Sequence, residues 1–275
     1  MKDNGLIFGA GYLGTRISEY FEYELSKINI LKTDLIASCL DVKKPTVVIN
    51  AAAKTGKPNV DWCEKNKEET IHVNVIGAIN LCIECVKRNI YFVHLGSGCI
   101  YRGNNNGAGY SEEDPPNFYG AQVYADSKIL SEKIIKEFPN CLLLRMGISI
   151  DDKPHERNFI DKARKYSRLF NIQISMMTVP HMLPILKTMI EKRMTGIYNF
   201  VNPGTISVAE IMKMYKEIVD PNYNFSICPP EEVRETTEVE RANCYLRTDK
   251  LRSKGLQFPE IHEAVRECLF NYKAN

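Results

Sequence analysis

The chain has 275 residues, 44% of them hydrophobic and 25% charged, which suits a globular protein with one large domain or two smaller ones. Its formal charge is +2, from 36 basic and 34 acidic side chains, so electrostatics gives no reason to expect nucleic acid or a membrane surface as a partner. We also expect no membrane span and no signal peptide, because no apolar run approaches roughly 20 residues and the N-terminus lacks a cleavage pattern.

In the first half of the chain, short apolar runs alternate with longer amphipathic segments, as in βαβ units around a parallel sheet. In chain order the sequence predicts strand 5–8, helix 12–25, strands 28–33 and 46–52, helix 68–88, strand 90–96, a polar loop 102–120, helix 122–137 and strand 141–147. We therefore predict an α/β fold with a Rossmann-type doubly wound parallel sheet, formed mainly by residues 1–150.

Beyond residue 150 the alternation weakens. The predicted elements there are helices 157–168, 180–192, 207–218 and 259–272 and a strand at 197–200. The charged run 231–241 is interpreted as a solvated helix or loop. We predict that residues 151–275 form mainly a smaller substrate-binding domain, from which some segments return to the sheet.

A glycine-rich turn lies between the first predicted strand and helix. Gly9, Gly11 and Gly14 have G-x-G-x-x-G spacing, and Tyr12 and Leu13 share the turn. Glycines at these positions permit a tight turn and a close approach to a pyrophosphate at the helix N-terminus, which predicts a dinucleotide site. Lys32, at the end of the second predicted strand, favours NADPH by its charge, whereas the nearby Asp34 leaves NADH open.

Tyr124 and Lys128 are four residues apart on a predicted helix, which puts them on one face. A phenol has a pKa near 10, and a neighbouring cation favours its ionised form. Ser97 stands 27 residues before this tyrosine, after a predicted strand. Together with the glycine turn, the three residues resemble those of dinucleotide-dependent dehydrogenases, and the resemblance implies that Tyr124 exchanges a proton, Lys128 lowers its pKa and Ser97 orients a ketone.

This set of residues resembles the extended short-chain dehydrogenase/reductase family. The segments "VINAAAKTGKPNVDWCE" (48–64), "GCIY" (98–101), "RNFI" (157–160) and "GIYNFVNPGTIS" (196–207) are similar to the reductase half of plant-type rhamnose synthases. Those proteins are nucleotide-rhamnose 3,5-epimerase/4-reductases, related to dTDP-4-dehydrorhamnose reductases. The resemblance implies that a UDP- or dTDP-linked 4-keto-6-deoxyglucose is converted to nucleotide-L-rhamnose with NADPH.

The resemblance also implies roles for further residues. The alanine-rich turn lines the cofactor, and Asn74 steadies the helix that carries Tyr124. The expected cofactor residues are Gly9, Gly11, Tyr12, Leu13, Gly14, Lys32, Asn50, Ala51, Ala52, Lys54, Asn74, Tyr124 and Lys128. The expected substrate residues are Asn59, Asp61, Ser97, Cys99, Arg157, Asn158 and Arg241.

Cys99 and Lys162 are the candidates for the epimerase step. Inversion at C3 and C5 of a 4-keto sugar needs a base on one face and an acid on the other. Cys99 lies two residues after Ser97, and in an extended strand both side chains would share a face. A similar cysteine has this role in GDP-fucose synthase, and the rhamnose-synthase resemblance implies a catalytic lysine at Lys162. We expect Cys99 as the base and Lys162 as the opposing acid, with His155 a weak substitute for the lysine.

Other readings remain open. A monofunctional dTDP-4-dehydrorhamnose reductase needs no acidic group at Cys99, and a non-catalytic NADP-binding regulatory subunit would share the fold. Nine cysteines without framework spacing favour free thiols and a cytoplasmic location. We expect no metal, because Cys82 and Cys85 lie on an apolar helix face, and we interpret His94 and His181 as structural. A separate 4,6-dehydratase would supply the 4-keto sugar; a homodimer is one open assembly.

Overall fold

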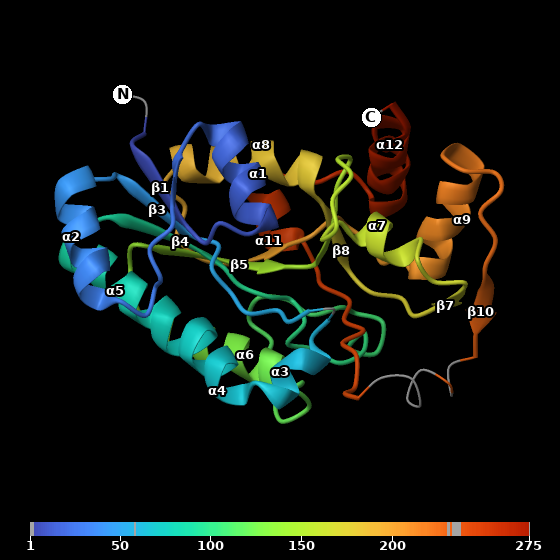
Figure 1. Cartoon of the computed structure of the whole chain (residues 1–275), viewed down its shortest axis with the longest axis horizontal. Helices are drawn as coiled ribbons and strands as arrows, with labels where there is room; N and C mark the ends of the chain where they lie inside the picture. Colours follow the sequence, from blue (N-terminus) through green and yellow to red (C-terminus); the bar gives the residue numbers. More distant parts are fainter. Residues whose placement is uncertain (1–2, 58, 230–231, 233–237, 275) are drawn as a thin grey trace. The chain divides into compact units, whose positions relative to one another are not determined.

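The computed structural model describes residues 3–57, 59–229, 232 and 238–274 (Figure 1). A six-stranded sheet has the order β2-β1-β3-β4-β5-β9. These strands are β1 (Gly5–Phe8), β2 (Glu24–Ser26), β3 (Val47–Asn50), β4 (Tyr91–Leu95), β5 (Cys141–Met146) and β9 (Gly196–Phe200). β1 pairs in parallel with β2 and β3, and β4 pairs in parallel with β3 and β5. The predicted Rossmann-like parallel α/β fold is confirmed.

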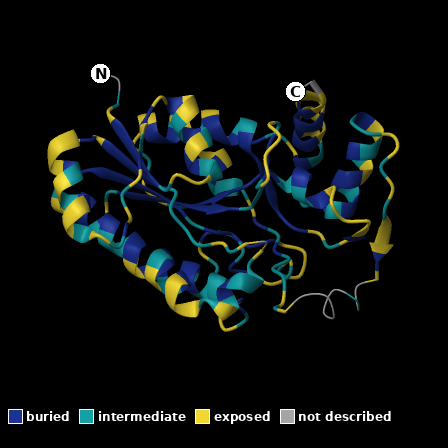
Figure 2. Cartoon of the chain, in the orientation of Figure 1, coloured by how far each residue is buried: buried dark blue, intermediate teal, exposed yellow. Residues whose placement is uncertain are grey.

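Helices cover both faces of this sheet. α1 (Tyr12–Phe21) lies on one face, whereas α5 (Ala78–Lys87) and α6 (Val123–Ile135) lie on the other (Figure 1). β1, β3, β4 and β5 are buried throughout (Figure 2), which explains why they are nearly continuous apolar runs in the sequence. One core cluster joins strand residues such as Phe8 and Phe92 to Leu81 of α5 and Ile135 of α6.

The predicted helix begins at Tyr12 as expected, but the sequence-based assignment between residues 22 and 43 was wrong. α1 ends at Phe21, where Glu22 has a left-handed φ of 58°, and the second strand follows at once as Glu24–Ser26. Residues 28–33 are not a strand: Ile28 and Ile30 pack against the core from a turn, which explains their apolar character. An unpredicted helix, α2 (Thr33–Lys43), then begins directly after Lys32.

The predicted helix 68–88 is present with an irregularity. α4 (Lys67–Ile71) continues into a π-helical turn, η1 (His72–Gly77), and then into α5. By length and a mean hydropathy of 1.3, Lys67–Lys87 would be able to cross a membrane, yet half of it is buried inside the protein. Since Leu81, Cys82 and Cys85 lie in the core cluster, its apolar composition is that of a core helix.

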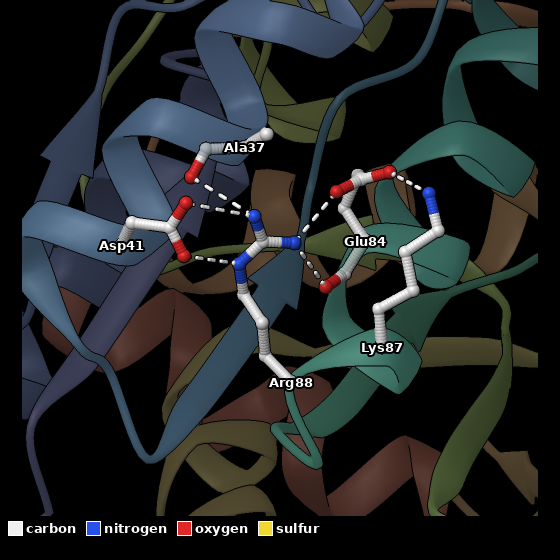
Figure 3. A network of polar contacts seen from close by, with 5 residues as sticks. All are labelled: Ala37, Asp41, Glu84, Lys87 and Arg88. Carbon is white, nitrogen blue, oxygen red and sulfur yellow. Dashed lines mark hydrogen bonds and ion pairs between the residues drawn. The ribbon is translucent and has the colours of Figure 1, made fainter.

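Arg88 ties α2 to α5 (Figure 3). Its guanidinium donates to both carboxylate oxygens of Asp41 at 2.7 and 3.0 Å and to the Glu84 carboxylate at 2.6 Å. Lys87 donates to the other Glu84 oxygen at 2.6 Å. Only 4% of Glu84 is exposed, so these cations balance a carboxylate that would otherwise be buried without a partner. The Lys87 and Arg88 hydrogen bonds lower the pKa of Glu84, against the effect of its burial.

The chain separates into two compact units. The first contains the chain up to Ile100, Phe118–Leu144 and Lys187–Tyr198; the second contains Tyr101–Asn117, Arg145–Leu186 and the chain from Asn199 onward. β9, which comes after residue 150, is a strand of the main sheet. The loop 102–120 has neither helix nor named strand, as predicted, and the predicted run 231–241 lies mostly outside the described residues.

The second unit contains two small parallel strand pairs and several helices. β6 (Ile148–Ile150) pairs with β8 (Met176–Thr178), and β7 (Arg168–Phe170) pairs with β10 (Ser226–Cys228). The named helices after residue 150 are α7 (Phe159–Ala163), α8 (Val179–Glu191), α9 (Val208–Ile218), α11 (Asp249–Ser253) and α12 (Ile261–Ala274), and α8 ends within the Lys187–Tyr198 segment of the first unit. Four correspond to the helices predicted after residue 150, although α7 is shorter than expected.

Candidate functional site

The glycine turn has the geometry of a dinucleotide site. Gly9 has a φ of +106°, and a Cβ on it would lie 2.3 Å from the backbone nitrogen of Ala52. A Cβ on Gly14 would lie 2.0 Å from the carbonyl oxygen of Gly9. Both positions therefore require glycine. Gly11 precedes α1, whose first residues are Tyr12 and Leu13. The N-terminus of a helix favours an anion such as a pyrophosphate through its N–H groups and its dipole.

The turn after β3, residues Asn50, Ala51 and Ala52, packs against this glycine turn; we call it the cofactor turn. The Asn50 side-chain oxygen accepts the N–H of Ala52 at 3.1 Å, which closes the turn. The strand order reverses between β1 and β3, because β2 lies on one side of β1 and β3 lies on the other. A ligand crevice is expected outside the carboxyl ends of the strands at such a point. The residues present therefore fit a bound dinucleotide.

Asn74 links this region to α6. Asn74 lies in the π-helical turn. Its side-chain oxygen accepts the N–H of Lys54 at 2.7 Å, and its side-chain nitrogen donates to the carbonyl of Lys54 at 3.0 Å and to the Ser127 hydroxyl at 3.0 Å. Ser127 in turn donates to the carbonyl of Tyr124 at 2.7 Å. The Lys54 side chain is paired with Glu69 at 2.5 Å. Lys54 thus contributes its backbone to this network.

The sequence predicted Lys32 at the end of the second strand, but the structure does not place it there. It precedes α2 and is exposed. β2 instead ends at Ser26, which is paired with Phe8, the last residue of β1 before the glycine turn. The basic residue that directly follows the end of β2 is therefore Lys27. Lys27 was missed because the true second strand is only three residues long.

Ser97 and Cys99 lie in a turn after β4 and not in the strand itself, which ends at Leu95. The predicted strand geometry is therefore wrong, but the turn brings the two residues together by another route. The Ser97 side-chain oxygen accepts the N–H of Cys99 at 3.1 Å. Burial raises the pKa of the Cys99 thiol, and a hydrogen bond with the Ser97 side chain acts in the opposite direction.

Tyr124 is close to the same two residues. Burial raises the pKa of its phenol above the ordinary value; the neighbouring Cys99 raises it further, and a side-chain hydrogen bond with Ser97 lowers it. Its hydroxyl therefore stays protonated at neutral pH, as a proton donor must. The expectation that Lys128 lowers the pKa of Tyr124 was wrong, because burial of the phenol raises it. Lys128, only 4% exposed, donates from its ammonium to the carbonyl of Leu95 at 3.1 Å. Burial lowers the pKa of Lys128 to about 8.

Two acidic side chains hold α6 in place and were not singled out from the sequence. Glu64 accepts the N–H of Val123, the first residue of α6, at 2.7 Å, and Asp126 accepts the N–H of Gly120 at 2.7 Å. A carboxylate at a helix N-terminus also interacts favourably with the helix dipole. No local pattern marks Glu64, because its partner is 59 residues away.

Lys162 belongs to the second unit, near the end of α7. It is partly buried, and burial, followed by the charge of Arg157, lowers the pKa of its ammonium. Asn158 is fully buried: its amide caps α7 through Ile160 and donates to the carbonyls of Asp151 and Lys153. Asn158 therefore fixes the loop that carries Arg157.

The other candidates are distributed over both units. Asn59 is exposed and its side chain accepts the N–H of Asp61 at 2.9 Å, just where α3 (Asp61–Lys65) begins. Arg241 is partly buried and lies in the second unit. The structure thus brings Ser97, Cys99 and Tyr124 together in the first unit, whereas Lys162, Arg157 and Arg241 belong to the second.

Known proteins are similar to this chain along nearly its whole length. The family described as RmlD substrate binding domain matches residues 9–274. A bifunctional dTDP-4-dehydrorhamnose 3,5-epimerase/dTDP-4-dehydrorhamnose reductase of Arabidopsis thaliana is 34% identical over 281 residues, covering 98% of this chain and 92% of that protein.

A trifunctional relative, the UDP-glucose 4,6-dehydratase/UDP-4-keto-6-deoxy-D-glucose 3,5-epimerase/UDP-4-keto-L-rhamnose-reductase RHM2 of Arabidopsis thaliana, is 36% identical over 280 residues. The match covers 97% of this chain and 41% of RHM2, so the chain spans about two fifths of that longer protein.

Two crystal structures extend the likeness to three dimensions. The L780 UDP-rhamnose synthase of Acanthamoeba polyphaga mimivirus superposes with a TM-score of 0.92 at 30% identity, covering 98% of this chain and 100% of that one. A dTDP-4-dehydrorhamnose reductase of Bacillus anthracis in complex with NADP gives a TM-score of 0.84 at 21% identity, covering 97% and 98% of the two chains, which concerns the fold.

Proposed function

Because this chain belongs to the family described as RmlD substrate binding domain, we propose that it uses NADPH to reduce the C4 ketone of a nucleotide-linked 6-deoxy sugar and that it also inverts C3 and C5. Membership confirms the resemblance inferred from the sequence. The observation that carries the proposal is that Ser97, Cys99 and Tyr124 lie close together in the first unit, which also contains the glycine turn. The bifunctional plant relative, 92% of which is covered by the match, supports both activities.

In the reduction, Tyr124 donates its hydroxyl proton to the C4 oxygen. NADPH, when bound, supplies the hydride to C4. Ser97 orients the ketone through its hydroxyl, and Lys128 binds the cofactor ribose and stabilises the phenolate that Tyr124 leaves behind. The raised pKa of Tyr124 supports this direction, because the phenol enters the reaction protonated.

The glycine turn, the first turn of α1 and the cofactor turn would hold NADPH. Gly9 and Gly14 allow the glycine turn to pack closely on the cofactor turn and on α1, whereas a Cβ on Gly11 would meet no other atom within 4 Å, which supports a ligand that approaches the backbone there. Lys32 remains a candidate for the 2′-phosphate, and Lys27, which follows β2, is added as the stronger one. NADH is the alternative cofactor.

For the inversions, we propose that Cys99 and Lys162 act as an acid–base pair on C3 and C5, whose hydrogens are acidified by the C4 ketone. The raised pKa of Cys99 favours a thiol that donates a proton, and the lowered pKa of Lys162 favours an amine that accepts one. These directions reverse the roles expected from the sequence. Ser97 and Tyr124 would stabilise the enolate oxygen through the same contacts that they use in reduction.

Arg157 and Arg241 are proposed to bind the diphosphate of the substrate, because a guanidinium binds two oxygens at once. Asn59 and Asp61 are proposed to contact the sugar nucleotide, UDP- or dTDP-linked. A separate 4,6-dehydratase would supply the 4-keto sugar. A cytoplasmic location is supported by the cysteines, all nine of which lie in described residues and are free thiols. Assembly as a homodimer remains one proposal.

The main alternative is a monofunctional dTDP-4-dehydrorhamnose reductase, which would need neither Cys99 nor Lys162 as an acid–base group. A non-catalytic NADP-binding subunit is less favoured, because Ser97, Tyr124 and Lys128 are all present.

One incubation separates these functions. The protein is mixed with UDP-4-keto-6-deoxyglucose and NADPH, and the sugar is identified by NMR. UDP-L-rhamnose supports the bifunctional enzyme. If the protein reduces only a sugar that has been epimerised beforehand, it is a monofunctional reductase; NADPH binding with no turnover of either sugar identifies the binding subunit.

A further inference from the structure

His94 is a buried polar residue within β4, and none of the reaction steps proposed above uses it. Only 1% of it is exposed. In the parallel sheet it stands abreast of Asn50 on β3 and of Leu143 on β5, and its ring stacks on that of Phe92 at 6.2 Å. A hydrophobic side chain would fill such a position without the free-energy cost of burying a polar ring. We therefore look for the role of His94 in its ring nitrogens.

The hydrogen bonds around Asn50 determine the tautomer of His94. The Asn50 side-chain oxygen is already bound by the N–H of Ala52 at 3.1 Å. The amide nitrogen of Asn50 therefore faces Nδ1 of His94, at 3.1 Å. Since an amide nitrogen only donates, Nδ1 must be the acceptor, and the proton of the neutral ring is on Nε2.

The surroundings keep the ring neutral. Burial, followed by the charge of Lys128, lowers the pKa of His94 well below its ordinary value. The ammonium of Lys128 is held on the carbonyl of Leu95, the residue after His94, at 3.1 Å. Protonation of Nδ1 would remove the acceptor for Asn50 and add a second buried cation. Nε2 is buried and has no hydrogen-bond partner among the described residues, so the bond that the ring makes is the one to Asn50.

We propose that His94 is a positioning residue: as a neutral acceptor it fixes the Asn50 amide, which in turn holds the cofactor turn against Gly9. Without the acceptor, the Asn50 amide would be free to rotate and release the N–H of Ala52. The turn would then have to be ordered again when NADPH binds, which lowers the apparent affinity. This role rests on the NADPH-dependent activity proposed above.

Two variants of the full-length protein test the proposal. His94→Leu removes the acceptor, whereas His94→Asn places a side-chain oxygen close to the position of Nδ1; both lose the ring and Nε2. We expect His94→Leu to raise the dissociation constant for NADPH about tenfold, the scale of one lost buried hydrogen bond. His94→Asn should stay within about twofold of the wild type. Melting temperatures measured alongside separate loss of folding from loss of affinity.

A second measurement reads the tautomer directly. In protein labelled with ¹⁵N-histidine, the His94 resonances, assigned by their absence in His94→Asn, should report a proton on Nε2 from about pH 6 to 9. A proton on Nδ1, or equal NADPH affinity in both variants and the wild type, would overturn the positioning role alone. A wild-type protein that does not bind NADPH would overturn the proposed function together with this role.

Discussion

The Ser97 side-chain oxygen and the Cys99 backbone N–H form a 3.1 Å hydrogen bond in the turn after β4. This bond ties the residue proposed to orient the ketone to the residue proposed to protonate the neighbouring carbons. Both residues also act on the pKa of Tyr124. Burial raises this pKa most, Cys99 raises it further, and the hydrogen bond with Ser97 lowers it. One residue proposed for each activity, Ser97 and Cys99, therefore lies in the same small turn.

Cys99→Ser should abolish inversion at C3 and C5 while leaving reduction intact. Serine keeps the size and the backbone bond to Ser97, but its hydroxyl is far less acidic than a thiol. In D₂O with NADPH, the variant should form no inverted, deuterated sugar from the 4-keto-6-deoxy substrate. It should still reduce a sugar that was epimerised beforehand, which serves as the control. Inversion at the wild-type rate would mean that Cys99 only packs.

Tyr124→Phe should lower the turnover number for reduction by about 10²–10⁴, because the proton donor is lost. Binding of NADPH should stay within a few-fold, since the glycine turn and Lys128 are unchanged. Stopped-flow oxidation of NADPH gives the first quantity and fluorescence titration the second. Near-normal oxidation with substrate present would exclude Tyr124 as the acid.

NADPH affinity should fall as the pH rises through about 8. Burial lowers the pKa of Lys128 to about 8 in the free protein, so its charge, which favours the anionic cofactor, is present below that pH and lost above it. Titrations between pH 6.5 and 9.5 measure the effect, and Lys128→Met should give a flat profile. An unchanged pH dependence in that variant would point to another group.

Lys27→Ala should weaken NADPH more than NADH, by about tenfold, because a charge-assisted bond to the 2′-phosphate is lost. Lys32→Ala is the matched comparison, as it also removes one basic side chain between β2 and α2. A larger selective loss in Lys32→Ala would assign the 2′-phosphate to Lys32, despite its place before α2.

Arg88→Ala should lower the free energy of unfolding by about 2–3 kcal/mol, since buried Glu84 would lose one of its two cations. Asp41→Asn, which alters an exposed carboxylate, should have a clearly smaller effect than Arg88→Ala. The pKa of Glu84 is lowered in the folded state. Its contribution is therefore complete above the unfolded pKa near 4.3 and is lost as the pH falls through the folded one. Urea titrations at pH 7 and at acid pH should show the Arg88→Ala effect shrinking in acid.

Features that depend on nearby residues were predictable from the sequence. The glycine turn and the Tyr124–Lys128 spacing each lie within one local element, so period and spacing were enough to place them. The second strand was not predictable in this way, because Glu24–Ser26 is three residues long and the more apolar Ile28–Leu31 beside it packs from a turn. Strand propensity favoured residues 28–31, whereas tertiary packing placed the strand at Glu24–Ser26.

Contacts between distant residues could not be read from local pattern alone. The link from Asn74 to the helix of Tyr124 was expected only from the family resemblance. Its partners Lys54 and Ser127, 20 and 53 residues away, and the π-helical turn that carries Asn74 have no signal of their own in the sequence. Ser97 and Cys99 do meet, although they do so in a turn and not along a strand face. Here the expected proximity was right and its geometric reason was wrong.

The order in which the chain visits its two units bears on how the protein is made. The first unit receives its last segment, Lys187–Tyr198, only after the chain has passed twice through the second. During synthesis, this unit is therefore incomplete until residue 198 has left the ribosome, and until then β5 has an edge that β9 later covers. A nascent chain stalled near residue 150 would expose this edge, so we expect it to be a chaperone client and to aggregate when released early.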